Sequence, residues 1–600
     1  MRPGRGVGLR SCGAVVSMVI AGFLFGGAAE AEGQEYDVLI RNGWIVDGTG
    51  NPEFRGDVAV KDDMIVAVGR RLEPGNARRV VDAMGLYVAP GIIDLHSHAN
   101  RALTSLEVEG RQGRNLVTQG VTTVTPHDGT NVIWPLEDKI AVIEELGASL
   151  NVVLLVGHGN VRQEVLGGGA PRAATSEEVR RMQELVRSGM EAGAWGLKSA
   201  LEGAGMRYAT TEEVIELAKV AAEFDGFYTA HPRSEGQLPN WQTPSLVDGK
   251  PMDSAEAIEE TIRIGREAGI RVVATHVKGA GRTQWGRSMT HTTLVEQARA
   301  EGVEVYLDVY PYLTIGGGPS TLVPTWAFYG AEPDPDASAS DGDDPRAVFR
   351  ANLENPETRR LIETDVAFNL IRSGGADRTI VIDHPNSSYN GLTVAAVAER
   401  TGRSPVETVI YFALEGYEEH YPSITRVRTR EDGLRYSVTE KEPRFFPQGA
   451  HLRNQSVNEP DIEHYLKQPY TAIASDAGIV DVPGAYDNGP GSHPRYYGAF
   501  PRAMSRYVRD REVVDIGHAV RAATSLPAQI IGIQDRGLLR EGYKADIMIF
   551  DMDRLQDHAT IMEPKRFSEG VEYVLVNGEF TLDQGVPTGA LPGLVLKRSR

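Results

Sequence analysis

Eight short apolar runs, most of them separated by helical stretches, limit the folds open to this chain. The stretches 175–192, 211–223 and 253–268 begin with Thr or Asp followed by Glu, the pattern of a capped helix. Strands that alternate with helices form parallel sheets with crossover helices. We therefore expect an α/β fold. Eight strands match a closed (β/α)8 TIM-type barrel, with an open doubly wound sheet as the alternative. The predicted strands are 92–95, 122–125, 151–156, 194–197, 226–230, 271–275, 304–309 and 471–475.

The two ends of the chain differ from this middle region because both are rich in strand-like runs separated by turns such as Asn42-Gly43 and Asn577-Gly578. We predict that 36–90 and 526–600 pair into one small β-sandwich domain, which leaves 91–525 for the barrel. The runs are 36–40, 57–61 and 64–68 near one end and 545–550, 572–576 and 579–582 near the other.

One connection in the middle region is much longer than an ordinary loop. It joins the seventh and eighth predicted strands and contains further helix-like and strand-like pieces, so we expect an inserted subdomain or lid at about 323–465. Within it, the acidic, low-complexity stretch 332–344 lacks apolar residues to anchor it. Such a composition is typical of a mobile surface segment.

Residues 1–31 have the composition of an export signal. Three arginines precede an apolar run at 14–25 that is short for a membrane span, and Ala29-Glu30-Ala31 resembles a cleavage site. We expect an exported protein, periplasmic or secreted, without a membrane segment after signal removal. Cys12 is the only cysteine, so the remaining chain has no thiol to bind metal or attack a substrate. The net charge of −20 argues against nucleic acid and anionic membranes as partners.

The first predicted strand ends in His96-Ser97-His98. Side chains alternate along a strand, so both imidazoles lie on the same side of it. At the C-terminal end of a barrel strand, two such nitrogens can bind one metal ion. A His-x-His pair alone is weak support for a metal site. The interpretation therefore depends on the residues that end the other strands.

Three further strand ends carry groups of the same chemical kind. His231 follows the fifth predicted strand, His276 the sixth and Asp476 the eighth. Catalytic groups concentrate at the C-terminal ends of barrel strands. Taken with the His-x-His pair, they predict a metal centre at one end of the sheet.

These motifs resemble the amidohydrolase superfamily, and within it the N-acyl-D-amino-acid deacylase (D-aminoacylase) family. The resemblance extends over nearly the whole chain after the signal. It includes Gly120-Val-Thr-Thr-Val124, Gly157-His-Gly-Asn-Val-Arg162, His276-Val-Lys278, Asp308-Val-Tyr-Pro-Tyr312, Ser475-Asp-Ala477, His493-Pro-Arg495 and Ala545-Asp546.

The resemblance implies one or two divalent metal ions, with zinc expected. His96 and His98 would hold one ion, and His231 and His276 the other. Asp476 would contact the metal centre and act as the general base, taking a proton from water and passing it to the leaving amine. A bound zinc lowers the pKa of water to about 7, so a neighbouring carboxylate can accept that proton.

The chain departs from the family pattern after the second strand. There the family has a cysteine that bridges the metals, whereas this chain has Pro126-His127-Asp128-Gly129. Lys198 directly follows the fourth predicted strand, at a position where the family commonly has serine. Because a carboxylated lysine on this strand bridges two metals elsewhere in the superfamily, we expect Lys198 to do so here. The alternatives are a lysine paired with Asp128, or Asp128 as the bridge.

The resemblance also implies that Lys278, Tyr310 and Arg495 hold the carboxylate of the substrate. We therefore expect hydrolysis of N-acyl-D-amino acids to a carboxylate and a free D-amino acid. One alternative is a related amidohydrolase acting on a cyclic amide or a dipeptide, because Lys198 resembles the bridge of those enzymes. The other is a non-catalytic periplasmic binding protein, against which the intact ligands and Asp476 argue. The sequence predicts neither the acyl chain nor the oligomeric state.

Overall fold

The computed structural model describes residues 36–73, 77–127, 132–167, 170–203, 205–247, 249–315, 322–330, 332–334, 344–480 and 492–598. The predicted export signal lies outside these residues. So do Asp128 and most of the acidic stretch 332–344. No helix within the described part of the chain is both long and apolar enough to cross a membrane.

Parallel strands form the middle of the fold and fall into two hydrogen-bonded groups. The chain passes from one group to the other at residues 151–157 and again at residues 471–478. Each of the eight predicted runs forms a strand in one of these groups, which confirms the α/β class. The first group is β9 (Val156–Gly157), β10 (Gly196–Ala200), β11 (Phe227–His231), β12 (Arg271–Ala274), β13 (Val305–Val309) and β20 (Thr471–Ile473). The second is β21 (Ala477–Gly478), β6 (Ile92–His98), β7 (Val121–Pro126), β8 (Asn151–Val153) and β26 (Val595–Leu596).

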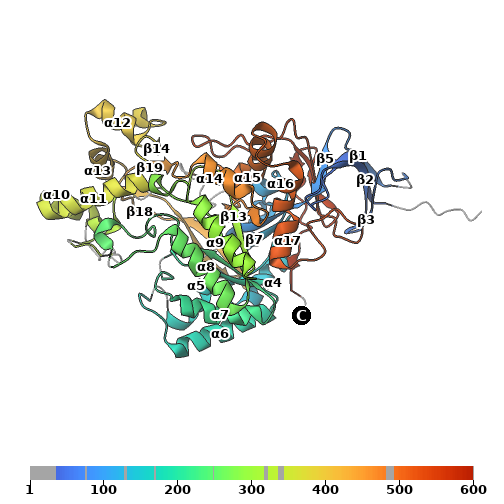
Figure 1. Cartoon of the computed structure of the whole chain (residues 1–600), viewed down its shortest axis with the longest axis horizontal. Helices are drawn as coiled ribbons and strands as arrows, with labels where there is room; N and C mark the ends of the chain where they lie inside the picture. Colours follow the sequence, from blue (N-terminus) through green and yellow to red (C-terminus); the bar gives the residue numbers. More distant parts are fainter. Residues whose placement is uncertain are drawn as a thin grey trace, which may run out of the picture.

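Helices follow most of these strands (Figure 1). They pack on the strands through buried aliphatic side chains. The predicted caps are present, because Thr175 with Glu178 and Asp253 with Glu256 form complete capping boxes. The helices are α1 (Asn100–Leu103), α2 (Val108–Gln112), α3 (Arg114–Val117), α4 (Leu136–Leu146), α5 (His158–Leu166), α6 (Ser176–Glu191), α7 (Thr211–Ala222), α8 (Ser254–Ala268), α9 (Ser288–Ala300), α14 (Glu459–Leu466), α15 (Arg495–Met504), α16 (Ile516–Ala523) and α17 (Ser525–Ile531).

Strands from both ends of the chain pair into one nine-stranded sheet. The N-terminal and C-terminal parts meet where β5 pairs antiparallel with β22, and β5 leads directly into β6. Its strands are β1 (Val38–Ile45), β2 (Phe54–Lys61), β3 (Met64–Gly69), β4 (Arg79–Asp82), β5 (Tyr87–Pro90), β22 (Ile547–Phe550), β23 (Val571–Val576), β24 (Glu579–Asp583) and β25 (Val586–Pro587). The sandwich packing and the exact domain limits stay predictions.

The long connection between β13 and β20 has a hydrophobic core of its own, which includes Trp326, Phe349 and Phe412. Figure 1 shows its helices at one end of the molecule and β1 to β3 at the other. Asp344, the last residue of the predicted acidic segment, instead caps α10 by accepting from Arg346 N. The elements are α10 (Pro345–Glu354), α11 (Pro356–Arg372), β14 (Thr379–Asp383), α12 (Val394–Thr401), α13 (Pro405–Glu415), β15 (Glu419–His420), β16 (Ser423–Thr429), β17 (Arg435–Lys441), β18 (Arg444–Phe445) and β19 (His451–Asn454).

Candidate active site

The C-terminal ends of the parallel strands converge on a cavity of about 270 Å³. His96 and His98 end β6, His231 ends β11, and His276 lies just after β12. Asp476 lies between β20 and β21, and β21 pairs with β6 so that Gly478 is opposite His98. All five predicted groups therefore line the same cavity.

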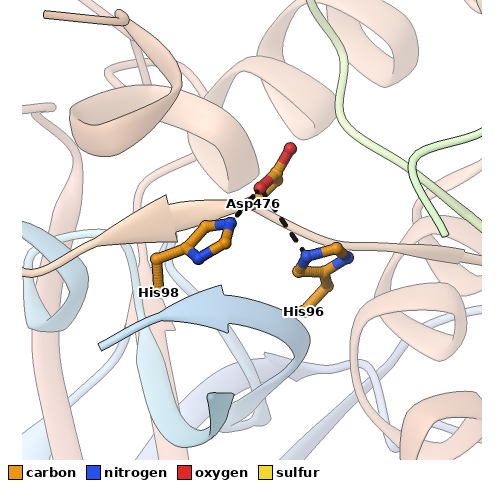
Figure 2. Close-up of side chains that lie close together, drawn as sticks. All are labelled: His96, His98 and Asp476. Carbon is orange, nitrogen blue, oxygen red and sulfur yellow. Dashed lines mark hydrogen bonds and ion pairs between the residues drawn. The ribbon is translucent and has the colours of Figure 1, made fainter. Parts of the chain in front are cut away.

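His96, His98 and Asp476 form the first of two clusters with the spacing of a metal site, in which one ligand atom from each lies within 4.8 Å of the others. Nε2 of His98 is 2.9 Å from Oδ1 of Asp476, and Nε2 of His96 is 3.7 Å from the same oxygen. Figure 2 shows both imidazole rings directed at this carboxylate.

Protonation in this cluster favours metal binding. Burial lowers the pKa of His96 to about 3, although the charge of Asp476 opposes that shift. Burial alone would raise the pKa of Asp476, but the charge of Arg495 and contact with the histidines hold it well below the usual range. Metal ligands must be deprotonated, so a neutral imidazole beside an ionised carboxylate is the required state.

His231, Glu235 and His276 form the second cluster, again with ligand atoms within 4.8 Å of one another. Oε1 of Glu235 is 2.7 Å from Nδ1 of His276 and also accepts from Lys278. Burial, with the charge of Lys278, lowers the pKa of His276 to about 4. The rings of His276 and His96 are 5.0 Å apart between centroids, so the two clusters are neighbours.

Backbone conformation sets two of these groups apart. His276 has φ of 34° and Asp476 has φ of 50°, in the left-handed region that non-glycine residues adopt infrequently. Such conformations cost about 1–3 kcal/mol each and persist where the surroundings enforce them. For Asp476 the neighbouring Ser475 supplies part of that restraint, because its backbone N donates to Asp94 at 3.0 Å.

Lys198 lies on the same face of the sheet as His231. The strand register places Lys198 opposite Thr229 and Ala200 opposite His231, and side chains alternate with period two. Its Nζ donates to the backbone O of His127 at 2.7 Å, and the His127 ring stacks on His96 with centroids 4.1 Å apart. Lys198 is thus linked to the first cluster through His127, and it does not itself line the cavity. Asp128, the alternative bridge, lies outside the described residues.

The three predicted substrate-binding residues also line the cavity. Two cations lie over the ring of Tyr310, with the Arg495 guanidinium carbon 4.9 Å and the Lys278 Nζ 5.5 Å from its centroid. Both cations already contact site carboxylates, because Arg495 pairs with Asp476 at 2.7 Å and Lys278 pairs with Glu235.

Known proteins are similar in sequence to this chain over nearly its whole length. A model of the amidohydrolase family matches residues 443–582. A D-aminoacylase of Alcaligenes xylosoxydans xylosoxydans is 29% identical, with 95% of this chain and 99% of that protein covered. The chain is thus similar to the D-aminoacylases of the amidohydrolase superfamily over nearly its whole length.

Two solved structures are similar to this chain over nearly its whole length. One is a D-aminoacylase described for its binuclear metal centre, with a TM-score of 0.68 and 26% identity over 94% of this chain and all of that one. The other is N-acyl-D-glutamate deacylase from Bordetella bronchiseptica, in complex with zinc and a phosphonate that mimics the tetrahedral intermediate. It has the same TM-score and 28% identity, over 94% of this chain and all of that one.

Two carboxylates of this site were missed in the sequence analysis. Glu235 belongs to the second cluster, and Glu202 lies 2.9 Å from Nε2 of His231 through its Oε2. Burial opposes protonation of His231, but these two carboxylates outweigh it and raise the pKa of His231. For Glu235, the one signal in the sequence was its place four positions after the strand-end histidine His231. His158, by contrast, bonds Ser199 and Glu213 in a buried network and does not line the cavity.

Proposed function

We propose that this amidohydrolase cleaves the amide bond of N-acyl-D-amino acids with the help of divalent metal ions, giving a carboxylate and a free D-amino acid. The observation that carries the proposal is the pair of histidine and carboxylate clusters at the strand ends, beside a cavity that also contains cations. The D-aminoacylase and the N-acyl-D-glutamate deacylase described above support the substrate class by their names.

The residues present fit zinc. Imidazole nitrogens and carboxylate oxygens are common zinc ligands, and each cluster brings three such groups together. His96, His98 and Asp476 would hold one ion, and His231, His276 and Glu235 the other. Zinc, when bound, polarises the scissile carbonyl and makes water more acidic. No nucleophilic side chain is then needed.

Asp476 is positioned to move the proton. It lies between β20 and β21. Its carboxylate is held ionised, so it can accept a proton from the attacking water and return it to the leaving amine. Its second oxygen, Oδ2, contacts Arg495 at 2.7 Å, which fixes the orientation of the carboxylate while Oδ1 faces the histidines.

Lys198 supplies the bridge in our proposal. Its ammonium would lose one proton, and the free amine would then add carbon dioxide and lose a second proton to form a carbamate, so that an anion replaces a cation beside the ions. The strand register, which puts Lys198 on the face of His231, supports this role. An unmodified ammonium next to two dications would be repelled strongly.

Arg495, Lys278 and Tyr310 would hold the carboxylate of the amino acid. A guanidinium can bind both carboxylate oxygens through its fork. Because Arg495 and Lys278 already pair with Asp476 and Glu235, substrate binding would have to share or exchange these contacts.

The parallel strands would close into one (β/α)8 barrel, and the N-terminal segment would direct export. Continuity of the chain between the two strand groups at residues 151–157 and 471–478 supports closure. The three arginines, the apolar run 14–25 and Ala29-Glu30-Ala31 support a periplasmic or secreted location.

A substrate panel tests the proposal. Purified protein loaded with zinc should release the free amino acid from N-acetyl-D-amino acids and leave the N-acetyl-L enantiomers intact. Hydantoins and dipeptides belong in the same panel, because faster turnover of either would favour the cyclic amide or dipeptide alternative. Tight zinc binding without turnover of any compound would favour a binding protein.

A further inference from the structure

The loop after β11 connects a metal ligand to the inserted subdomain. At the cavity, Asn240 donates from Nδ2 to Oε2 of Glu202 at 2.6 Å, and its backbone N donates to Oε1. The same Oε2 lies 2.9 Å from Nε2 of His231. Glu202 is buried, so these neighbours determine how its carboxylate is oriented.

The other side of this loop rests on α11 of the inserted subdomain. Arg372, the last residue of α11, donates to three backbone oxygens of the loop, namely those of Pro239 at 3.2 Å, Gln242 at 3.0 Å and Asn240 at 3.1 Å. One guanidinium therefore fixes both ends of the segment that presents Asn240 to Glu202.

A second residue of α11 holds the loop further along. The buried carboxylate of Asp365 accepts from Thr243 Oγ1 at 2.7 Å and from the backbone N of Ser245 at 3.0 Å. It also accepts from the indole of Trp326, in the hydrophobic core of the inserted subdomain, at 3.2 Å. The loop is thus attached to the inserted subdomain through two charged groups.

We propose that Arg372 is a positioning residue for the metal ligand His231, acting through Asn240 and Glu202. This inference rests on the proposed function, because it assumes that His231 binds a metal ion. A carboxylate at Nε2 keeps the proton on that nitrogen, so the lone pair of Nδ1 points to the metal. The inserted subdomain would then support the metal centre.

The chemistry of Arg372 explains why another cation would not serve. Its planar guanidinium offers five N–H donors in a fixed geometry, which suits three carbonyls that face it from different directions. Lysine offers a point charge on a flexible stem, so we expect Arg372→Lys to restore little of the effect.

Zinc affinity tests the inference directly. Chelator competition and elemental analysis on the full chain should show two zinc ions per wild-type chain. Arg372→Met should weaken one of them about 10- to 100-fold, the range for loss of a group that supports a metal ligand. Arg359→Met is the matched control, because Arg359 lies on the same helix, exposed, and pairs only with Glu363 at 2.8 Å among the contacts described. It should bind both ions normally.

A second variant keeps the test decisive if Arg372→Met fails to fold. Glu202→Gln has the same shape, but its amide can donate to Nε2 of His231 and so move the imidazole proton to Nδ1. We expect the same single zinc ion to be weakened, with the melting temperature of zinc-free protein nearly unchanged. Normal binding of both ions by Glu202→Gln, or by folded Arg372→Met, would overturn the inference alone. A wild-type chain that binds no zinc would overturn the proposed function as well.

Discussion

Replacing Asp476 by asparagine removes the proposed proton carrier with little change in shape. Asp476 is buried and contacts His98 at 2.9 Å and Arg495 at 2.7 Å, and an asparagine oxygen can keep one of these contacts. What disappears is the negative charge and the capacity to accept a proton.

The expected loss follows from that role. A positioned general base contributes typically about 10²- to 10⁴-fold in rate, which corresponds to roughly 3–5 kcal/mol in the activation free energy. We expect kcat for an N-acetyl-D-amino acid to fall by at least the lower factor. Six of the seven proposed metal ligands, Lys198 included, remain, so zinc content should stay close to that of the wild type.

Initial rates and elemental analysis on the same preparation measure both quantities. Asp461→Asn is the matched control, because Asp461 is also a buried carboxylate but accepts from Gly286 N at 2.9 Å away from the cavity. It should lower the melting temperature and leave kcat of the folded protein nearly unchanged. An Asp476→Asn variant with kcat within a few-fold of wild type would refute the assignment of the base.

Three further perturbations test other parts of the site. Lys198→Ala should lose one zinc ion and most activity, and a small added carboxylic acid should restore part of both. If Asp128→Ala empties the site while Lys198→Ala keeps both ions, Asp128 is the bridge. Arg495→Ala should raise KM for carboxylate-bearing substrates by an amount equivalent to about 2–5 kcal/mol. If the wild type hydrolyses an N-acyl amine without a carboxylate equally well, Arg495 does not hold the substrate carboxylate. Deleting 335–343, which keeps the Asp344 cap of α10, should leave the melting temperature and zinc content unchanged, and a drop of more than a few degrees would show that the segment packs on the fold.

The strand ends were predictable because they depend on local patterns. An apolar run followed by histidine or aspartate needs only the period of a strand and the direction of the chain, and His96, His98, His231, His276 and Asp476 all line the cavity as expected. The capped helices α6 and α8 were predictable for the same reason, since Thr175 and Asp253 act within one turn.

Groups that reach the site through loops were not predictable from the sequence. Glu235 and Glu202 lie outside any regular element, and their positions depend on contacts with residues far away in the chain. The left-handed backbone at His276 and Asp476 has the same origin, because the surrounding packing imposes a conformation that neither residue prefers. A single sequence carries no local pattern for such features.

The pairing of the two chain ends has a consequence for how the protein is made. β8 pairs with β26, with Val152 opposite Val595, and β5 pairs with β22. During synthesis, β5 and β8 therefore lack these partners until the C-terminal strands emerge from the ribosome several hundred residues later. Contacts of this separation slow folding and leave strand edges open for aggregation until they form. Under the proposed export, that delay would keep the chain unfolded while it crosses a membrane. Truncation before β26 should leave the edge of β8 unpaired and give aggregation-prone material that cannot complete its sheets.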